Sequence, residues 1–202
     1  TLDGHDNAIW GLEPLPDGSC FATYSEDGTC KIWDAPIDGQ NTCRRLCTLS
    51  GMHDGAVYCV AILSCGRIVS GGEDYSICVW TAEGHCEFQA EAEDIVEHLV
   101  ALPDCRFVSS GGGDSKLTVW HVDNEGTVSH VHTLEGHIEA IRCIKASPDD
   151  WGDFFISGSD DGTVVFWGAV EGRCLRSFDG HTNSVVDICV LPDMRVVSAS
   201  HD

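Results

Sequence analysis

The sequence predicts an all-β chain built from four complete copies and one incomplete copy of a small antiparallel sheet. A segment that starts with Asp and ends with Trp six residues later occurs at 27–33, 74–80, 114–120 and 161–167, and a fifth copy starts at Asp202. Short runs of Val, Ile, Leu and Cys alternate with turn residues, and no amphipathic segment of helical length interrupts them. Recurrence at this period predicts a repeat architecture with one four-stranded sheet in each unit.

The first unit shows the expected order of strands. Strands are predicted at 9–15, 20–23, 29–33 and 44–49, and the first two are separated by the turn Pro16-Asp17-Gly18.

Later units repeat this order. The apolar runs 56–63, 138–146 and 185–191 carry few charges, which is typical of strands packed on both faces between neighbouring sheets. The predicted units are 3–49, 50–89, 90–134, 135–178 and the partial 179–202.

Polar residues recur at fixed places in these units. A small hydroxyl residue stands four positions before each Asp, and a His, usually after Gly, stands further upstream. In the third unit the position that corresponds to this His, eleven residues before Pro103 in the turn Pro103-Asp104, is occupied by Ala92. The sets are His5, Thr23, Asp27 and Trp33; His53, Ser70, Asp74 and Trp80; Ser110, Asp114 and Trp120; His137, Ser157, Asp161 and Trp167; and His181, Ser198 and Asp202.

This pattern resembles the WD-repeat family of β-propellers, and the resemblance covers the whole chain. The final Asp of the family's Trp-Asp signature survives only at Trp33-Asp34. The resemblance implies radial four-stranded antiparallel blades in which the His, hydroxyl, Asp and Trp form a hydrogen-bonded chain. A buried Trp N–H needs an acceptor and a buried Asp needs donors, so such a chain fixes the turn and the strand register.

The length predicts an incomplete propeller. At roughly 40–45 residues per blade, 202 residues hold fewer than five blades. An open arc leaves apolar faces and strand edges in water. We therefore expect a piece of a longer propeller, seven-bladed in most members of the family, completed by further blades of the same chain. The alternative is a partner chain that covers the open ends.

The recurring Ser, His and Asp imitate a hydrolase triad, but we interpret them as structural. A catalyst needs one constellation in one pocket, whereas these residues repeat with the unit. No nucleophile elbow, P-loop or dinucleotide fingerprint is present. We predict no enzyme activity, no catalytic residues, no cofactor and no metal site.

The charge limits the classes of partner that the protein can bind, and the cysteine pattern indicates its redox compartment. The 33 acidic residues against 11 basic ones give a formal net charge of −22, which disfavours nucleic acid and anionic membranes. The twelve cysteines stand singly, without a CxxC pair, as in a reducing compartment. We expect an intracellular, cytoplasmic protein.

The resemblance also implies a binding face, formed by positions just before each Asp and three and five residues after each His. These positions carry two large aromatic residues and several carboxylates, which suit a Lys- or Arg-bearing peptide. Arg142 either pairs with Asp160 or marks where an acidic group of the ligand lies. The predicted face comprises Trp10, Glu26, Tyr58, Glu73, Glu97, Arg142 and Asp160.

The favoured function is therefore a non-catalytic scaffold or adaptor that docks a basic protein segment. Two alternatives remain at this point: a structural subunit of a large assembly, and the regulatory propeller of a larger enzyme.

Overall fold

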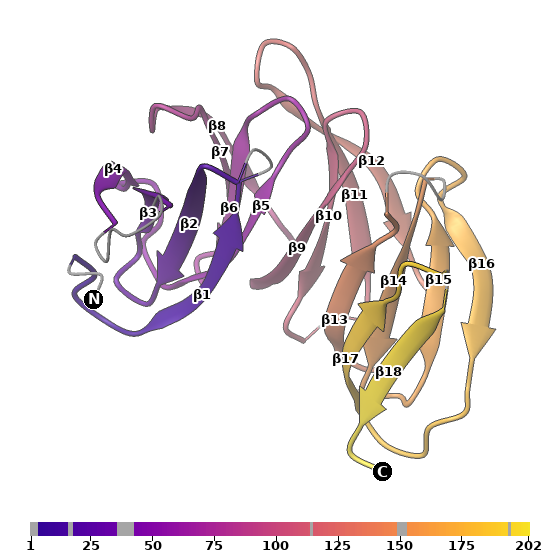
Figure 1. The fold of residues 1–202 in the computed structure, drawn as a ribbon. Helices are drawn as coiled ribbons and strands as arrows, with labels where there is room; N and C mark the ends of the chain where they lie inside the picture. Colours follow the sequence, from indigo (N-terminus) through magenta and orange to yellow (C-terminus); the bar gives the residue numbers. More distant parts are fainter. Residues whose placement is uncertain (1–3, 16–17, 36–42, 114, 149–152, 194) are drawn as a thin grey trace.

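The computed structural model consists of strands and connecting turns (Figure 1). It describes residues 4–15, 18–35, 43–113, 115–148, 153–193 and 195–202. All described elements are β-strands, which confirms the predicted fold class. None of the described residues forms a helix of the length and hydropathy that a membrane crossing requires.

The described residues form eighteen strands, arranged as four four-stranded sheets and one two-stranded sheet, all antiparallel. The first sheet contains β1 (Ile9–Pro14), β2 (Cys20–Ser25), β3 (Cys30–Asp34) and β4 (Arg45–Leu49). The second contains β5 (Val57–Ile62), β6 (Ile68–Gly72), β7 (Ser76–Trp80) and β8 (Cys86–Glu91). The third contains β9 (Val96–Leu102), β10 (Arg106–Gly111), β11 (Leu117–Val122) and β12 (Val128–Leu134). The fourth contains β13 (Ile141–Ala146), β14 (Phe154–Ser159), β15 (Val164–Gly168) and β16 (Arg173–Phe178), and β17 (Val185–Val190) pairs with β18 (Val196–Ser200).

Each sheet is a meander in which consecutive strands are neighbours, as expected for strands joined by short turns. The first strands of successive units, β1, β5, β9, β13 and β17, contact one another in that order. Figure 1 shows the result, an open arc with β1 at one end and the β17–β18 hairpin at the other.

The core lies between the sheets. One apolar cluster joins each pair of neighbouring units, for example Ile32 with Val57 and Trp80 between the first and second. Every residue of β6 and β7 is buried, because these strands are covered on both faces. Of the three apolar runs expected to pack on both faces, only the strand in 56–63, β5, has no exposed residue. The strands in 138–146 and 185–191, β13 and β17, include exposed residues, so the prediction is wrong for these two.

Most predicted strand boundaries differ from the observed ones by one to three residues. The last strand of the second unit, β8, ends at Glu91, two residues beyond the predicted limit of 89. The run 138–146 begins its strand at Ile141, and Ile138 is 83% exposed in the preceding loop. The N–H of Ile138 donates to Asp161, so this residue belongs to the polar turn rather than to the strand. The predicted Asp114 lies outside the described residues.

Candidate functional site

A hydrogen-bonded chain of side chains links the strands of the first unit. His5 contacts Asp27 Oδ2 through Nδ1 and Thr23 Oγ1 through Nε2, both at 2.8 Å. The indole N–H of Trp33 donates to the same Thr23 hydroxyl at 2.8 Å. Although burial opposes it, hydrogen bonds from Thr29 and the N–H of Asp6 hold the pKa of the Asp27 carboxyl well below its usual range.

The same chain recurs in the second and fourth units. Trp80 donates to Ser70 and Trp167 to Ser157, at 2.8 and 2.7 Å. The remaining contacts are His53 with Ser70 and Asp74, His137 with Ser157 and Asp161, and, in the fifth unit, His181 with Ser198 and Asp202. In the first, second and fourth units the chain joins the turn before the unit to its second and third strands, and in the fifth it joins that turn to β18 and the residues after it.

The third unit departs from the predicted pattern. Trp120 donates its indole N–H to Ser109 at 2.8 Å, so the prediction of Ser110 as the hydroxyl of this unit is wrong. Ser109 pairs with Thr118, two residues before Trp120, as Thr23 pairs with Lys31, two residues before Trp33. The hydroxyl and the Trp are eleven residues apart here and ten in the first unit. The chain is therefore one residue longer between them, and counting back from Asp114 selected the neighbouring serine.

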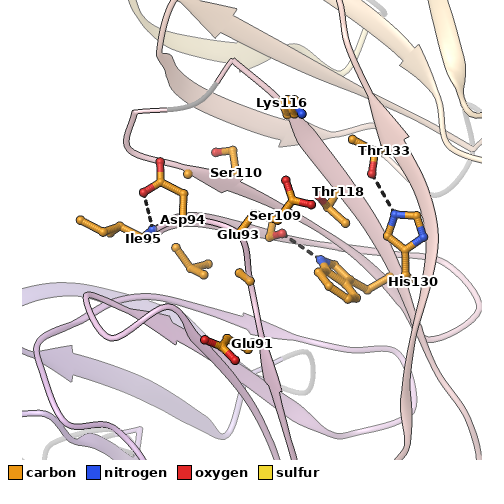
Figure 2. A pocket seen from close by; sticks show the side chains of 14 residues that line it. Glu91, Glu93, Asp94, Ile95, Ser109, Ser110, Lys116, Thr118, His130 and Thr133 are labelled. Carbon is orange, nitrogen blue, oxygen red and sulfur yellow. Dashed lines mark hydrogen bonds between the residues drawn. The ribbon is translucent and has the colours of Figure 1, made fainter.

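A cavity of about 170 Å³ lies beside this Trp (Figure 2). Ala92 lines it and stands four residues before Val96, the first residue of β9, as His53 stands four before Val57. The hydroxyl of Ser110 is buried there and makes no hydrogen bond with any described residue. Figure 2 shows His130, which contacts the edge of Trp120 and pairs with Thr133, at another side of the cavity. The third unit thus lacks the imidazole that joins its turn to its strands.

The predicted binding face contains an aromatic pair. Trp10 on β1 and Tyr58 on β5 lie in neighbouring units, with ring centroids 5.8 Å apart in an edge-to-face arrangement. Trp10 is 54% exposed, unusually high for a side chain of this size. The two rings therefore form a ridge of apolar surface across the boundary between two units.

Three carboxylates lie close enough to Tyr58 of this pair to act on its hydroxyl. Partial burial and the negative charges of Glu73, Glu97 and Glu26 raise the pKa of the Tyr58 hydroxyl. Glu73 is held beside β5, since its carboxylate accepts from the N–H of Ala56 at 3.4 Å. Glu26 is exposed and directly precedes Asp27 of the hydrogen-bonded chain.

Arg142 and Asp160 pair with each other, which decides between the two roles considered for Arg142. Its Nε and Nη2 atoms lie 2.8 and 2.5 Å from Asp160 Oδ2, and Ser184 donates to the other carboxylate oxygen. Hydrogen bonds from Arg142 and Ser184 lower the pKa of the Asp160 carboxyl. Both oxygens of Asp160 are therefore engaged within the protein.

No group of three His, Cys, Asp or Glu side chains among the described residues is arranged to hold a metal ion. All twelve cysteines are free.

Comparison with known families agrees with this geometry. The family described as "WD domain, G-beta repeat" matches residues 1–34, 43–81, 128–168 and 172–202, more than half of the chain. The chain belongs to the WD-repeat family. The unmatched stretch 82–127 contains Ala92 and the longer turn of the third unit.

Individual relatives place the chain among proteins of this family. It is 26% identical to Striatin-4 of Mus musculus over 90% of its length and 28% identical to Protein Notchless of Drosophila melanogaster over 96%. It spans only 24% and 39% of the lengths of these two proteins. The crystal structure of the WD40 β-propeller domain of Doa1 is similar over 98% of this chain and 64% of that one, with a TM-score of 0.76 at 22% identity. Together these similarities establish the propeller fold and, at the general level, support a protein-interaction scaffold.

Proposed function

We propose that this chain is a non-catalytic protein–protein interaction scaffold whose acidic, aromatic face docks a basic segment of a partner. The observation that carries this proposal is the pair formed by the exposed Trp10 and the half-buried Tyr58, with the negative charges of three Glu residues acting on Tyr58. We call the five residues Trp10, Glu26, Tyr58, Glu73 and Glu97 the acidic aromatic face.

The chemistry of this face suits a Lys or Arg side chain. The face of an aromatic ring attracts a cation, and the attraction amounts to about 0.5–1 kcal/mol at an exposed site and more when water is excluded. Carboxylates beside the rings add charge pairing, and exposed Trp and Tyr are common anchors of interfaces. The net charge of −22 further attracts a basic partner over longer distances.

Asp160 and Arg142 have a different part in this proposal. Because they neutralise each other, they offer a basic ligand little net charge. We therefore assign them to the edge of the face, where they orient one another, and leave cation binding to the acidic aromatic face.

The exposed ends of the arc bear on how the ring is completed, and the cysteines bear on the cellular location. Exposed apolar side chains stand at both ends of the arc, Ile9 and Leu12 on β1 and Val186 and Val197 on β17 and β18. They support our proposal that further blades, from the same chain or a partner, complete the ring. Twelve free thiols support an intracellular, cytoplasmic location.

The test is a binding measurement on the full-length protein with a fluorescent peptide that carries alternating Lys and Gly. We expect Trp10→Ala to weaken binding at least about tenfold, which corresponds to roughly 1.4 kcal/mol. Leu175→Ala is the matched control, because Leu175 is also an exposed apolar residue, at 47%, but lies on the outermost strand of the fourth unit.

A second pair of variants tests the charges. Glu26→Lys should weaken binding, whereas the same change at the exposed Glu125, in the turn between β11 and β12, should leave it within about twofold at physiological salt. Equal loss with Glu26→Lys and Glu125→Lys would mean that only overall charge attracts the peptide, and this face would not be the docking site.

A further inference from the structure

Two turns of neighbouring units meet at the side of the second and third sheets. One turn joins β5 to β6 and contains Cys65, and the other joins β9 to β10 and contains Cys105. The N–H of Cys105 donates to the hydroxyl of Ser64 at 3.3 Å, and its sulfur lies 3.9 Å from the same oxygen. Because Cys65 follows Ser64 directly in the sequence, the two cysteines lie on turns that touch, and each affects the pKa of the other's thiol. The packing of β5 against β9 thus brings together two cysteines that lie 40 positions apart in the sequence.

A fixed cation stands beside this pair. The Arg67 Nε lies 2.5 Å from Glu87 Oε2 on β8, and its Nη2 donates to the carbonyl of Asn124 at 3.0 Å. These contacts hold the guanidinium at the junction of the two units, two residues along the chain from Cys65, and its charge acts to lower the pKa of the Cys65 thiol. Burial acts to raise the pKa of the Cys65 thiol, but hydrogen bonds from Cys105 and from the backbone and side chain of Arg67 outweigh it and lower this pKa. The same arrangement raises the pKa of Cys105, in which burial is the largest cause.

A second pair of neighbouring thiols serves as a comparison for the effect of Arg67 on thiol reactivity. Cys78 and Cys86 of the second unit also affect each other's pKa, but Cys78 is fully buried, and burial raises the pKa of both thiols. Thiolates are the reactive form of cysteine, so proximity alone does not make that pair reactive. Cys65, in contrast, is exposed and lies next to a cation.

We propose that Cys65 and Cys105 form a modification site, a peroxide-sensitive disulfide that joins the second and third units. Cys65 supplies the attacking thiolate, Arg67 stabilises it, and Cys105 is the resolving thiol. This inference is independent of the docking face.

The chemistry needs a peroxide as the oxidant and proceeds in two steps. The Cys65 thiolate attacks one oxygen of hydrogen peroxide, so that an S–O bond forms, the O–O bond breaks and hydroxide leaves. Cys105 then attacks the sulfur of this sulfenic acid, so that the S–S bond forms, the S–O bond breaks and a second hydroxide leaves. The two thiol protons convert both hydroxides to water. Two thiols and one peroxide thus yield one disulfide and two waters.

The experiment treats the reduced full-length protein with one equivalent of hydrogen peroxide near neutral pH and maps its peptides without reduction. We expect a cross-linked peptide pair that contains Cys65 and Cys105 and is separated by a dithiol reductant. In Cys105→Ser, a sulfenic-acid probe should label Cys65 instead. Cys65→Ser should abolish both the cross-link and the label at this junction.

Two comparisons make the result decisive. Arg67→Gln should slow disulfide formation about threefold for each unit by which the pKa of Cys65 rises, because greater nucleophilicity offsets part of the lost thiolate fraction. Cys78 and Cys86 should remain reduced under conditions that oxidise the junction pair. The proposal is overturned if Cys78–Cys86 cross-links as fast, or if Cys65 reacts no faster than the exposed Cys174 on β16.

Discussion

Trp120 donates its indole N–H to Ser109, 2.8 Å away, and not to the adjacent Ser110, whose buried hydroxyl makes no hydrogen bond with any described residue. The two serines are consecutive and equally buried, at 5% and 3% exposure, yet only one of them completes a pair. They therefore offer a test of the hydrogen-bonded chain within a single unit.

Ser109→Ala should lower the free energy of unfolding by about 1–3 kcal/mol, because it leaves the Trp120 N–H without its acceptor. Ser110→Ala should be neutral or stabilising, since it removes a buried hydroxyl that has no partner in the described chain. Urea denaturation of both variants measures the difference. Equal losses would show that the hydrogen bond contributes nothing beyond packing.

Ala92→His should stabilise the third unit, by about 1 kcal/mol. The cavity beside Ala92 adjoins the Ser109 and Ser110 hydroxyls, and in the four other units an imidazole bonds such a hydroxyl. Ala92→Leu is the control, because it fills space without a polar atom. If the His variant is less stable than the Leu variant, the longer turn has changed the site so that it no longer accepts an imidazole.

Stability should fall in two stages as the pH decreases. Burial lowers the pKa of His137, so the unfolded chain binds this proton more readily, and the stability from neutral His137 is lost as the pH falls below about 6.5. The folded pKa values of Asp74 and Asp161 are also lowered, because hydrogen bonds outweigh burial, and their contribution is lost below about pH 4. Urea midpoints measured from pH 8 to pH 3 follow both stages.

His137→Gln separates the two stages. It should flatten the profile between about pH 6.5 and 5 and leave the loss below pH 4 in place. An unchanged slope near pH 6 in this variant would show that another group titrates there.

Gly71→Ala should destabilise the protein by about 1–3 kcal/mol, because a Cβ on β6 would overlap the side chain of Val96 in the next unit. Gly180→Ala is the matched control: no atom lies within 4 Å of the Cβ position there, so the change should be neutral or slightly stabilising. Thermal unfolding compares them. Similar behaviour of the two variants would mean that the units can move apart at little cost.

Much of this fold could be predicted from the sequence, because residues close together in the sequence determine the strands and turns of each unit. The interval from Asp27 to Trp33 and the doubly apolar strands recur with the sheet, so the sheets and their order follow from spacing alone. Register within the third unit could not be predicted, since one additional residue between Ser109 and Trp120 moves the hydroxyl by one position. Ser109 could have been identified from its position opposite Thr118, two residues before Trp120. That requires knowing how β10 pairs with β11, which the sequence does not give.

The contacts between units were harder to predict. Even within one unit, the pairing of Arg142 on β13 with Asp160, in the turn after β14, was only one of two roles that the sequence allowed. The meeting of Cys65 and Cys105 depends on how closely two sheets pack, and their separation in sequence matches no known ligand or disulfide spacing.

The central claim is that the acidic aromatic face recognises positive charge, and a charge swap tests it most directly. Affinities of the full-length protein and of Glu26→Lys/Glu73→Lys are measured by calorimetry for two peptides that differ only in Lys against Glu. We expect the natural protein to bind the Lys peptide and the variant to lose it at least about tenfold while gaining the Glu peptide. If the variant keeps its affinity for the Lys peptide, with its unfolding curve unchanged, the account of this face is wrong.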